Sequence, residues 1–449
     1  MMKKRLLLLS VICLFLNTVS GQENYKLRFD LSIVDLPQNI DFPQAFPSMD
    51  QTLTLSSDLY ELGFFGIGEL GDWIFKPERE NYSNLKKLGN NVFKYVAGLA
   101  FSKYGSELPL PLGVWGHEEF HRAVLGANDI NSKNGNWLLN RWDGTVYGVS
   151  DETLGLLKIN GPEQLLYSYV SGIQYEVLLN EKETLSDFYY QRKTPKSALI
   201  LYNAYYVWDY FRFSTGRASD SAKVIAPPHE SSDPRERDFT GADLTAWVYD
   251  MFNPDLPYDE RDPFPQGTGV NRRIGFSDLN ASEREFLMDQ KKLSLLNFLN
   301  PYIFFINQFR ISDDFSFNFF ARYAPVNFGN DVALFLPFKY RNTGYLLNLH
   351  RYANHNQKGY GLGLRFIDIK VHESLLMDVS IDLWDQPENF FSAQKTRGGF
   401  FSIKPEYSFS DKFSAYIRLS GKTKGWLIGN PYLDENFSVQ SGIILNITD

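Results

Sequence analysis

Two histidines and a glutamate stand close together in the segment GHEEFHR, which runs from Gly116 to Arg122. His117 and His121 are four residues apart, so on a helix they lie one turn apart on the same face. Two imidazoles at that spacing can both reach one zinc ion at about 2.0–2.1 Å. Glu118 lies about 100° further round the helix, where it can contact a water on the ion but is badly placed as a ligand. These residue types predict a metal-dependent hydrolytic site in which Glu118 is the general base.

The flanking residues predict the helix that this geometry requires. Pro109 and Pro111 precede the motif, and Gly126 and Asn128 follow it as a stop signal. We therefore expect a helix over about residues 113–125, with Glu119 pointing away from the metal and into solvent. The alternative is a helix whose two histidines bond to buried carbonyl or carboxylate groups and hold no metal.

The HExxH pattern resembles the zincin metallopeptidases, which carry this signature on their active-site helix. The resemblance covers only about residues 116–126. The metzincin continuation is missing, since Ala123, Val124 and Leu125 follow His121 and no histidine comes at the required place. The closer comparison is with the gluzincins, in which a glutamate on a later helix is the third ligand. The resemblance implies a zinc peptidase, and a zincin that has lost its activity remains an alternative.

The third ligand has to come from elsewhere in the chain. Glu176 is our candidate, because it lies on a predicted helix over residues 162–182 and flanks the apolar stripe of that helix. Asp209, Asp243 and Glu163 remain competitors, and Glu176 can also be a surface carboxylate that pairs with a neighbouring helix. Three further side chains are candidates for stabilising an oxyanion or orienting a ligand: Tyr169, Tyr175 and Arg122.

The N-terminus has the pattern of a secretory signal peptide over residues 1–21. Lys3, Lys4 and Arg5 precede an apolar run, and small residues follow at Val19–Gly21. Cys13 lies in that run and is the sole cysteine, so the mature chain would have no disulfide and no thiolate metal site. We expect an exported protein of the cell envelope; an uncleaved membrane anchor is the alternative.

The rest of the chain divides by its periodicity. Residues 22–70 hold one alternating run, KLRFDLSIVDL, which can join a later sheet, and residues 71–215 are predicted to form the helical domain with the HExxH motif. Residues 216–300 begin with an irregular stretch rich in Pro, Gly, Asp and Arg, which indicates a covering or gating loop. A short helix follows, with Ser282 and Glu285 as its capping box.

Residues 301–449 change to a period of two, as in LLMDVSIDLW, where Val379, Ile381 and Leu383 alternate with Ser380 and Asp382. Eight to ten such segments predict an antiparallel β-meander. Their length of about ten residues and their small, polar second side favour an outer-membrane β-barrel over a soluble β-sandwich. The expected fold class is α+β: an N-terminal helical zincin-like region followed by an antiparallel meander, in the form of an outer-membrane-type β-barrel.

Two functions fit these observations best, and a soluble binding protein that carries a β-sandwich is a third. The first is an exported, membrane-associated zinc metallopeptidase-like hydrolase that acts on a peptide or envelope protein. The second is a non-enzymatic outer-membrane β-barrel, a channel or assembly platform, with the helical region as a plug. The net charge of −8 and the lack of a basic block beyond the N-terminus argue against a nucleic-acid partner.

Overall fold

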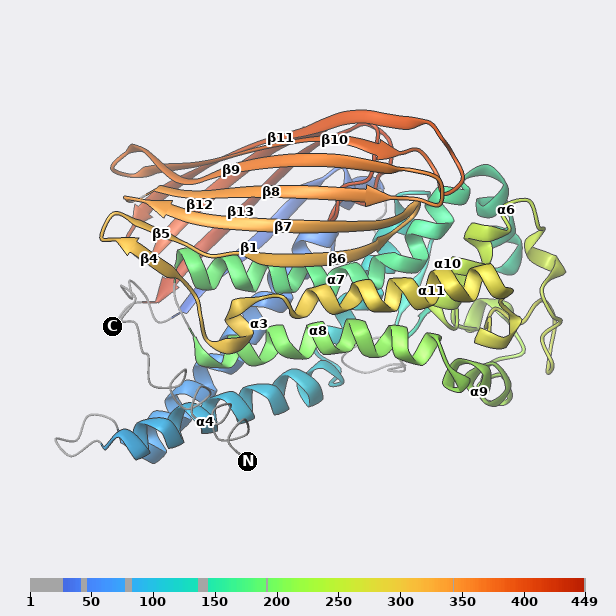
Figure 1. Cartoon of the computed structure of the whole chain (residues 1–449), viewed down its shortest axis with the longest axis horizontal. Coiled ribbons are helices and arrows are strands. Elements are labelled where there is room, and N and C mark those ends of the chain that lie inside the picture. Colours follow the sequence, from blue (N-terminus) through green and yellow to red (C-terminus); the bar gives the residue numbers. More distant parts are fainter. Residues whose placement is uncertain are drawn as a thin grey trace, which may run out of the picture.

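The computed structural model describes residues 27–41, 47–76, 83–135, 144–190, 193–341 and 343–447. The predicted signal peptide lies outside these residues. The fold class is α+β, as the sequence predicts: a largely helical region is followed by an antiparallel β-meander. Figure 1 shows the sheet as a curved layer over the helices, with helix α7 along its inner side.

Eleven strands form the large sheet, in the order β1-β13-β12-β11-β10-β9-β8-β7-β5-β4, with β6 also paired to β7. The N-terminal strand β1 pairs antiparallel with β13, so the first and last described strands are neighbours. The strand path ends at β1 and at β4, and among the described residues it does not close into a ring. The strands are β1 (Leu27–Leu36), β4 (Phe309–Ser312), β5 (Phe315–Phe317), β6 (Phe320–Val326), β7 (Gly329–Tyr340), β8 (Thr343–Ala353), β9 (Lys358–His372), β10 (Leu375–Pro387), β11 (Lys395–Ser410), β12 (Phe413–Lys422) and β13 (Asn436–Ile447).

The two faces of the sheet follow the alternation in the sequence. In β10, Leu383 is 58% exposed on the outer face, whereas its neighbour Asp382 is 8% exposed on the inner face. Successive side chains of a strand point to opposite faces, so an apolar-polar alternation produces one apolar and one polar face. Here the apolar face is the exposed one, which is the arrangement of a sheet that faces lipid.

The helical region contains two short strands, β2 (Lys133–Asn134) and β3 (Val146–Tyr147), which pair with each other. Within the described residues, no helix is both long and apolar enough to cross a membrane. The helices are α2 (Gln38–Asp41), α3 (Met49–Phe75), α4 (Asn84–Ala100), α5 (Gly113–Gly126), α6 (Asp151–Asn160), α7 (Pro162–Tyr189), α8 (Thr194–Ser214), α9 (Arg217–Ile225), α10 (Asp243–Phe252) and α11 (Ala281–Ser294).

Helix α7 is the centre of the molecule. It starts at Pro162, where the missing N–H costs nothing, and runs for 28 residues. Buried polar contacts join the side of α7 that faces the sheet to strand β6. Gln174 Nε2 donates to the Pro325 carbonyl at 2.7 Å, and Glu181 pairs with Arg322 at 2.5 Å. Helix α5 packs across the other side of α7, with Phe120 against the ring of Tyr175. This packing puts the HExxH motif against the middle of the core helix.

The segment predicted as a covering loop has more structure than its composition indicates, because it contains α9 and α10. Ion pairs fix it to α6: Arg272 pairs with Asp151 at 2.7 Å, and Asp250 with Lys158 at 2.9 Å. The helix that follows, α11, is capped by Asn280, whose side chain accepts from the Glu283 backbone N–H, and not by the predicted Ser282. The helix therefore begins two residues earlier than expected, with an Asn that satisfies orphan N–H groups of its first turn.

Candidate metal centre

Helix α5 presents both histidines to the interior. The helix runs from Gly113 to Gly126, close to the expected 113–125, and the His117 and His121 rings lie 4.9 Å apart on one face. His117 is 4% exposed and His121 is 1% exposed. Two buried imidazoles so close together need polar partners, because each ring nitrogen would otherwise lose its hydrogen bonds to water.

Asp243, at the start of α10, brings a carboxylate to both rings. Its Oδ2 lies 3.4 Å from Nε2 of His117 and 3.4 Å from Nε2 of His121. Two ligands bonded to one tetrahedral zinc at about 2.0–2.1 Å are about 3.3–3.4 Å apart, so these two separations fit a shared ion. One ligand atom from each of the three residues lies within 4.8 Å of the others. The donor set of two imidazoles and one carboxylate is also one that zinc uses in catalytic sites.

The other ring nitrogens contact different groups. Nδ1 of His117 faces the Glu176 carboxylate at 3.1 and 3.3 Å, and Nδ1 of His121 faces the Ser168 carbonyl at 2.5 Å. A carboxylate or carbonyl at Nδ1 fixes the tautomer that leaves Nε2 free to bind a metal. Glu176, the predicted ligand, is therefore brought to the histidine pair, but at the Nδ1 side of His117, whereas Asp243 lies at the Nε2 atoms.

Asp243 is itself held in place by two hydroxyl groups. Tyr210 Oη donates to Asp243 Oδ2 at 2.7 Å, and Thr240 Oγ1 donates to Oδ1. The rings of Tyr206 and Tyr210 also meet the His117 ring edge-on. The sequence did not identify Tyr206, Tyr210 or Thr240 as candidates. The aromatic residues of α8 indicate only a buried, apolar helix.

Gly172 on α7 leaves the space in which the two Nε2 atoms lie. A Cβ at this position would be 2.2 Å from Nε2 of His121 and 2.4 Å from Nε2 of His117. Any side chain would therefore collide with both nitrogen atoms. The glycine is required by the close approach of α7 to α5 at the histidines, a need that one sequence does not reveal.

Glu118 lies beside this cluster and is 9% exposed. Burial raises the pKa of its carboxyl well above the ordinary value, His117 opposes this, and the acids Asp238, Asp243 and Glu176 add to it. Among the described residues, no hydrogen bond occupies the Glu118 carboxylate. A buried carboxyl with a raised pKa is the kind of group that exchanges protons in catalytic sites.

Charge pairing organises the cluster. Burial alone would lower the pKa of His117, but the Glu176 and Asp243 carboxylates outweigh it and hold that pKa well above the ordinary value. Burial would raise the pKa of Asp243, yet His121 and His117 hold it well below its usual range. Burial raises the pKa of Glu176.

Other residues proposed from the sequence lie away from the two Nε2 atoms. Glu119 does point away, but it is 2% exposed and not solvated, since Arg122 Nη1 binds it at 2.7 Å. The pair explains the burial, because a buried charge needs a partner. It also takes Arg122 out of any oxyanion role. The Tyr169 hydroxyl donates to Asp250 at 2.9 Å, and Tyr175 packs on Phe120.

Two of the alternative ligands also lie elsewhere. Asp209 pairs with Arg212 at 2.6 Å on the surface of α8, and Glu163 lies in the first turn of α7.

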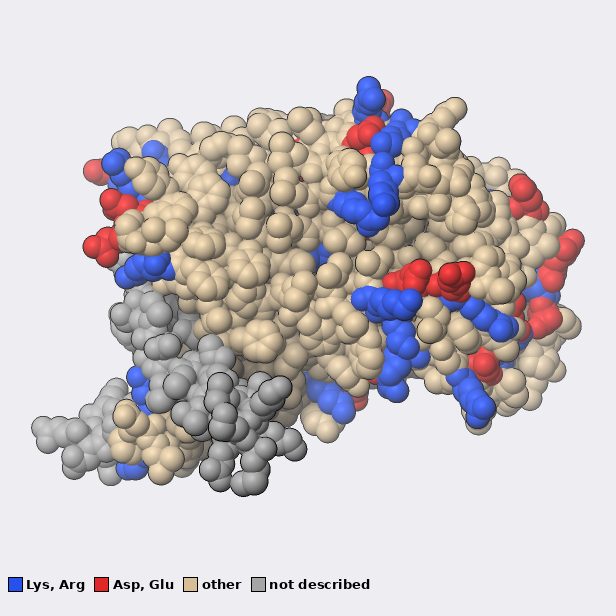
Figure 2. Space-filling view, viewed as in Figure 1, with Lys and Arg blue, Asp and Glu red and all other residues tan. Residues whose placement is uncertain are grey.

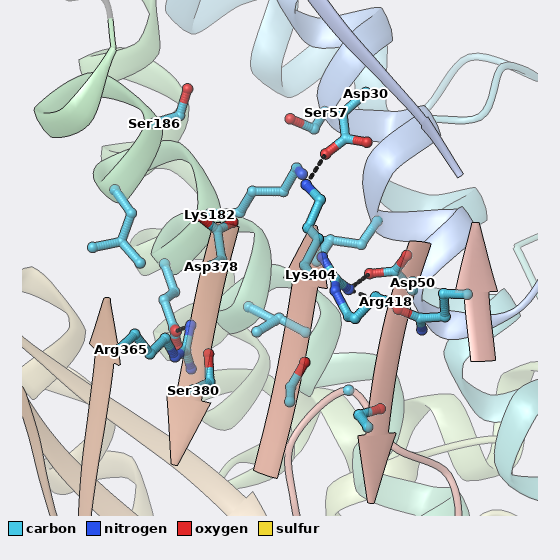
Figure 3. A pocket seen from close by; sticks show the side chains of 18 of the residues that line it. Asp30, Asp50, Ser57, Lys182, Ser186, Arg365, Asp378, Ser380, Lys404 and Arg418 are labelled. Carbon is cyan, nitrogen blue, oxygen red and sulfur yellow. Dashed lines mark hydrogen bonds and ion pairs between the residues drawn. The ribbon is translucent and has the colours of Figure 1, made fainter. Parts of the chain in front are cut away.

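A separate cavity of about 420 Å³ lies between the inner face of the sheet and helices α3 and α7. Its walls carry many charged side chains, which mostly pair with one another. Figure 3 shows Lys404 directed at Asp30 and Arg418 directed at Asp50. The Lys404 Nζ–Asp30 Oδ2 distance is 3.9 Å, and the Arg418 Nη1–Asp50 Oδ1 distance is 3.2 Å. A polar inner face is what the sequence predicts for the interior side of the meander.

Comparisons with known proteins add little. No family model and no curated protein matches the chain. The solved structure of the NanC porin in its rhombohedral crystal form is similar over 31% of this chain and 76% of its own, with 8% identity and a TM-score of 0.25. At that TM-score the likeness assigns neither fold nor function.

Proposed function

We propose that the chain is a membrane-associated, zinc-dependent hydrolase of the HExxH type. His117, His121 and Asp243 would hold the ion, Glu118 would be the general base, and Glu176 would orient His117. The observation that supports this most is the pair of 3.4 Å separations between Asp243 Oδ2 and the two Nε2 atoms. The proposal moves the third ligand from Glu176 to Asp243.

The residues present fit zinc on two grounds besides these distances. The Nδ1 atom of each histidine already has an acceptor, so the tautomer with a free Nε2 lone pair is favoured in both rings. The Asp243 carboxylate keeps Oδ2 toward the histidines while Thr240 holds its other oxygen. Zinc in such a site supplies Lewis acidity, which lowers the pKa of water and polarises a carbonyl group.

The chain's own residues supply the remaining parts of a hydrolytic reaction. Glu118 takes a proton from the attacking water and returns it to the leaving group; its raised pKa supports this role, and no hydrogen bond from the described residues occupies its carboxylate. Glu176 stabilises the positive charge of His117, and the surrounding tyrosine rings exclude bulk water. A peptide bond is the substrate class that the resemblance to zincins implies, so a peptide or envelope protein is the proposed substrate.

The membrane part of the proposal comes from the outer face of the sheet. In β9, the outer side runs from Tyr360 to Val371, because an extra residue between Phe366 and Ile369 returns the odd-numbered side chains to that face. These eleven residue steps span about 36 Å along the strand. Strands tilted by about 45° would cover about 25 Å of depth, the height of the apolar band of outer-membrane barrels. Figure 2 shows that charged side chains gather toward the two ends of this face and are sparse between them. Export to the outer membrane fits this face and the predicted signal peptide.

A second candidate is a non-enzymatic outer-membrane protein in which α7 is a plug. It is favoured by the position of α7 along the inner side of the sheet, where Glu181 pairs with both Arg322 and Arg365. In this case the histidine cluster would only be a buried charge network. Both candidates are membrane proteins, but only the hydrolase binds zinc.

Substitution of Glu118 separates the candidates. The detergent-extracted chain and its Glu118→Gln variant would be compared for zinc content and for cleavage of a fluorogenic peptide library. We expect about one zinc per chain in both, with cleavage lost only in the variant, because the base is removed while the ligands stay. Zinc absent from both proteins would leave the plug candidate alone.

A further inference from the structure

The helix α4 has an unusual polarity. Its inward-facing polar residues Asn90 and Lys94 both bind Asp72 on α3, at 2.7 and 2.8 Å. Its outward side instead carries large apolar side chains, with Val92 and Val96 being 42% and 57% exposed. A helix on the surface of a water-soluble protein has the opposite arrangement, an apolar side toward the core and a polar side toward water.

The end of α3 continues this apolar surface. Leu70, Trp73 and Ile74 are 48%, 72% and 45% exposed. Leu85, near the start of α4, is 78% exposed, and Tyr104, just after α4, is 62% exposed. Trp and Tyr are the side chains that favour the boundary between lipid and water. Figure 1 shows this α3–α4 hairpin projecting below the body, at the same end as the β4–β5 turn.

The charged side chains of α4 and the residues that follow it indicate which kind of partner the hairpin binds. Between Asn84 and Ser106 the chain has four lysines and no acidic residue; they are Lys86, Lys87, Lys94 and Lys103. All four lysines carry positive charge beside the apolar stripe, and Lys94 also pairs with Asp72. Apolar side chains flanked by lysines are the pattern of a helix that lies in the interface of a membrane with anionic lipids.

Continuity with the sheet supports the same partner. Strand β1 is the edge of the sheet, and the first half of α3 lies against it: Asp58 on α3 accepts from the Asp30 backbone N–H at 3.1 Å. Ile33 on β1 is 56% exposed and Leu62 on α3 is 48% exposed. Exposed apolar side chains therefore occur on the sheet, at its edge strand and on the hairpin. One bilayer can contact all three.

We propose that the outer surface of the α3–α4 hairpin, formed by Leu70, Trp73, Ile74, Leu85, Val92 and Val96, is seated in an anionic lipid bilayer beside the sheet. The sheet then contributes one part of the lipid contact, and the hairpin contributes another on the side where the strands do not close. This inference rests on the proposed membrane association, and it is independent of the metal.

Site-directed spin labelling tests the hairpin and the sheet separately. Because Cys13 is the sole cysteine, single labels can be placed in a Cys13→Ser background through Val96→Cys on the hairpin and Ile381→Cys on the outer face of the sheet. Ser282→Cys, on the exposed first turn of α11, is the matched aqueous control. The full chain is reconstituted in vesicles of three parts phosphatidylcholine and one part phosphatidylglycerol. Collision of each label with oxygen, which concentrates in lipid, is compared with collision with a water-soluble nickel chelate.

We expect the labels at 96 and 381 to collide mainly with oxygen and the label at 282 mainly with nickel. A lipid signal at 381 with a nickel signal at 96 would overturn the hairpin proposal and leave the membrane association of the sheet intact. Protection of position 96 from both reagents would also overturn it, because protein would then cover the hairpin. Nickel signals at 96 and 381 would overturn both proposals.

Discussion

Replacing Gly172 by alanine should strongly weaken metal binding without removing any ligand. The added Cβ would lie 2.2 Å from Nε2 of His121 and 2.4 Å from Nε2 of His117, where real contacts are no shorter than 3.0 Å. The rings would have to retreat by at least 0.8 and 0.6 Å, the differences between 3.0 Å and those two distances. Metal–ligand distances tolerate only about 0.2 Å, so neither imidazole could keep its bond.

The loss of zinc affinity should be large because both imidazole ligands are displaced at once. We expect zinc affinity to fall by more than about a hundredfold, beyond the range of about tenfold to a hundredfold known for outer-shell changes. Competition with a chromophoric chelator measures the affinity, and circular dichroism checks that the helices remain. The control is Gly155→Ala on α6, where the nearest atom to an added Cβ is 3.6 Å away. Wild-type zinc affinity in Gly172→Ala would refute the placement of the ion between these rings.

Three further changes have defined outcomes. Glu176→Gln should keep one zinc per chain but weaken its binding by about tenfold to a hundredfold, because an amide orients His117 less firmly; complete loss of zinc in equilibrium dialysis would restore Glu176 as a ligand. Zinc affinity should rise with pH, because the carboxylates hold the pKa of His117 above its ordinary value and the metal binds the neutral ring; affinity that is flat from pH 6 to 8 would contradict this. Burial raises the pKa of Asp58 to about 7, so between about pH 4 and 7 the folded state holds a proton that the unfolded state releases. The free energy of unfolding should therefore fall by about 2–4 kcal/mol as the pH rises over that range. In thermal melts, Asp58→Asn should remove this fall, whereas Asp289→Asn at the surface should not.

Local patterns in the sequence predicted the parts of this fold that depend on local physics. The proline and glycine signals around the motif located α5 to within a residue, and the alternation after residue 300 identified the meander. Helix α3 was missed because its glycines, serines and threonines are poor helix formers. Ser48 and Gln51 do form a capping box, which is a start signal visible in the sequence.

The third donor and the shape of the sheet depend on contacts between distant segments. Spacing along the chain could not choose between Glu176 and Asp243, because α7 and α10 reach the histidines from different directions. Gly172 and Tyr210 matter only because α7 and α8 pack beside α5. Alternation fixes which side chains face outward on a strand, but it does not fix whether the first and last strands meet.

X-ray absorption at the zinc edge tests the metal centre most directly. The detergent-extracted chain should carry about one zinc with two imidazole nitrogens and a carboxylate oxygen at about 2.0–2.1 Å. Asp243→Ala should lose the ion, while Glu118→Gln should leave the spectrum unchanged. A chain without zinc, or an Asp243→Ala variant that binds it with an unchanged spectrum, would contradict the assignment of His117, His121 and Asp243 as the ligands.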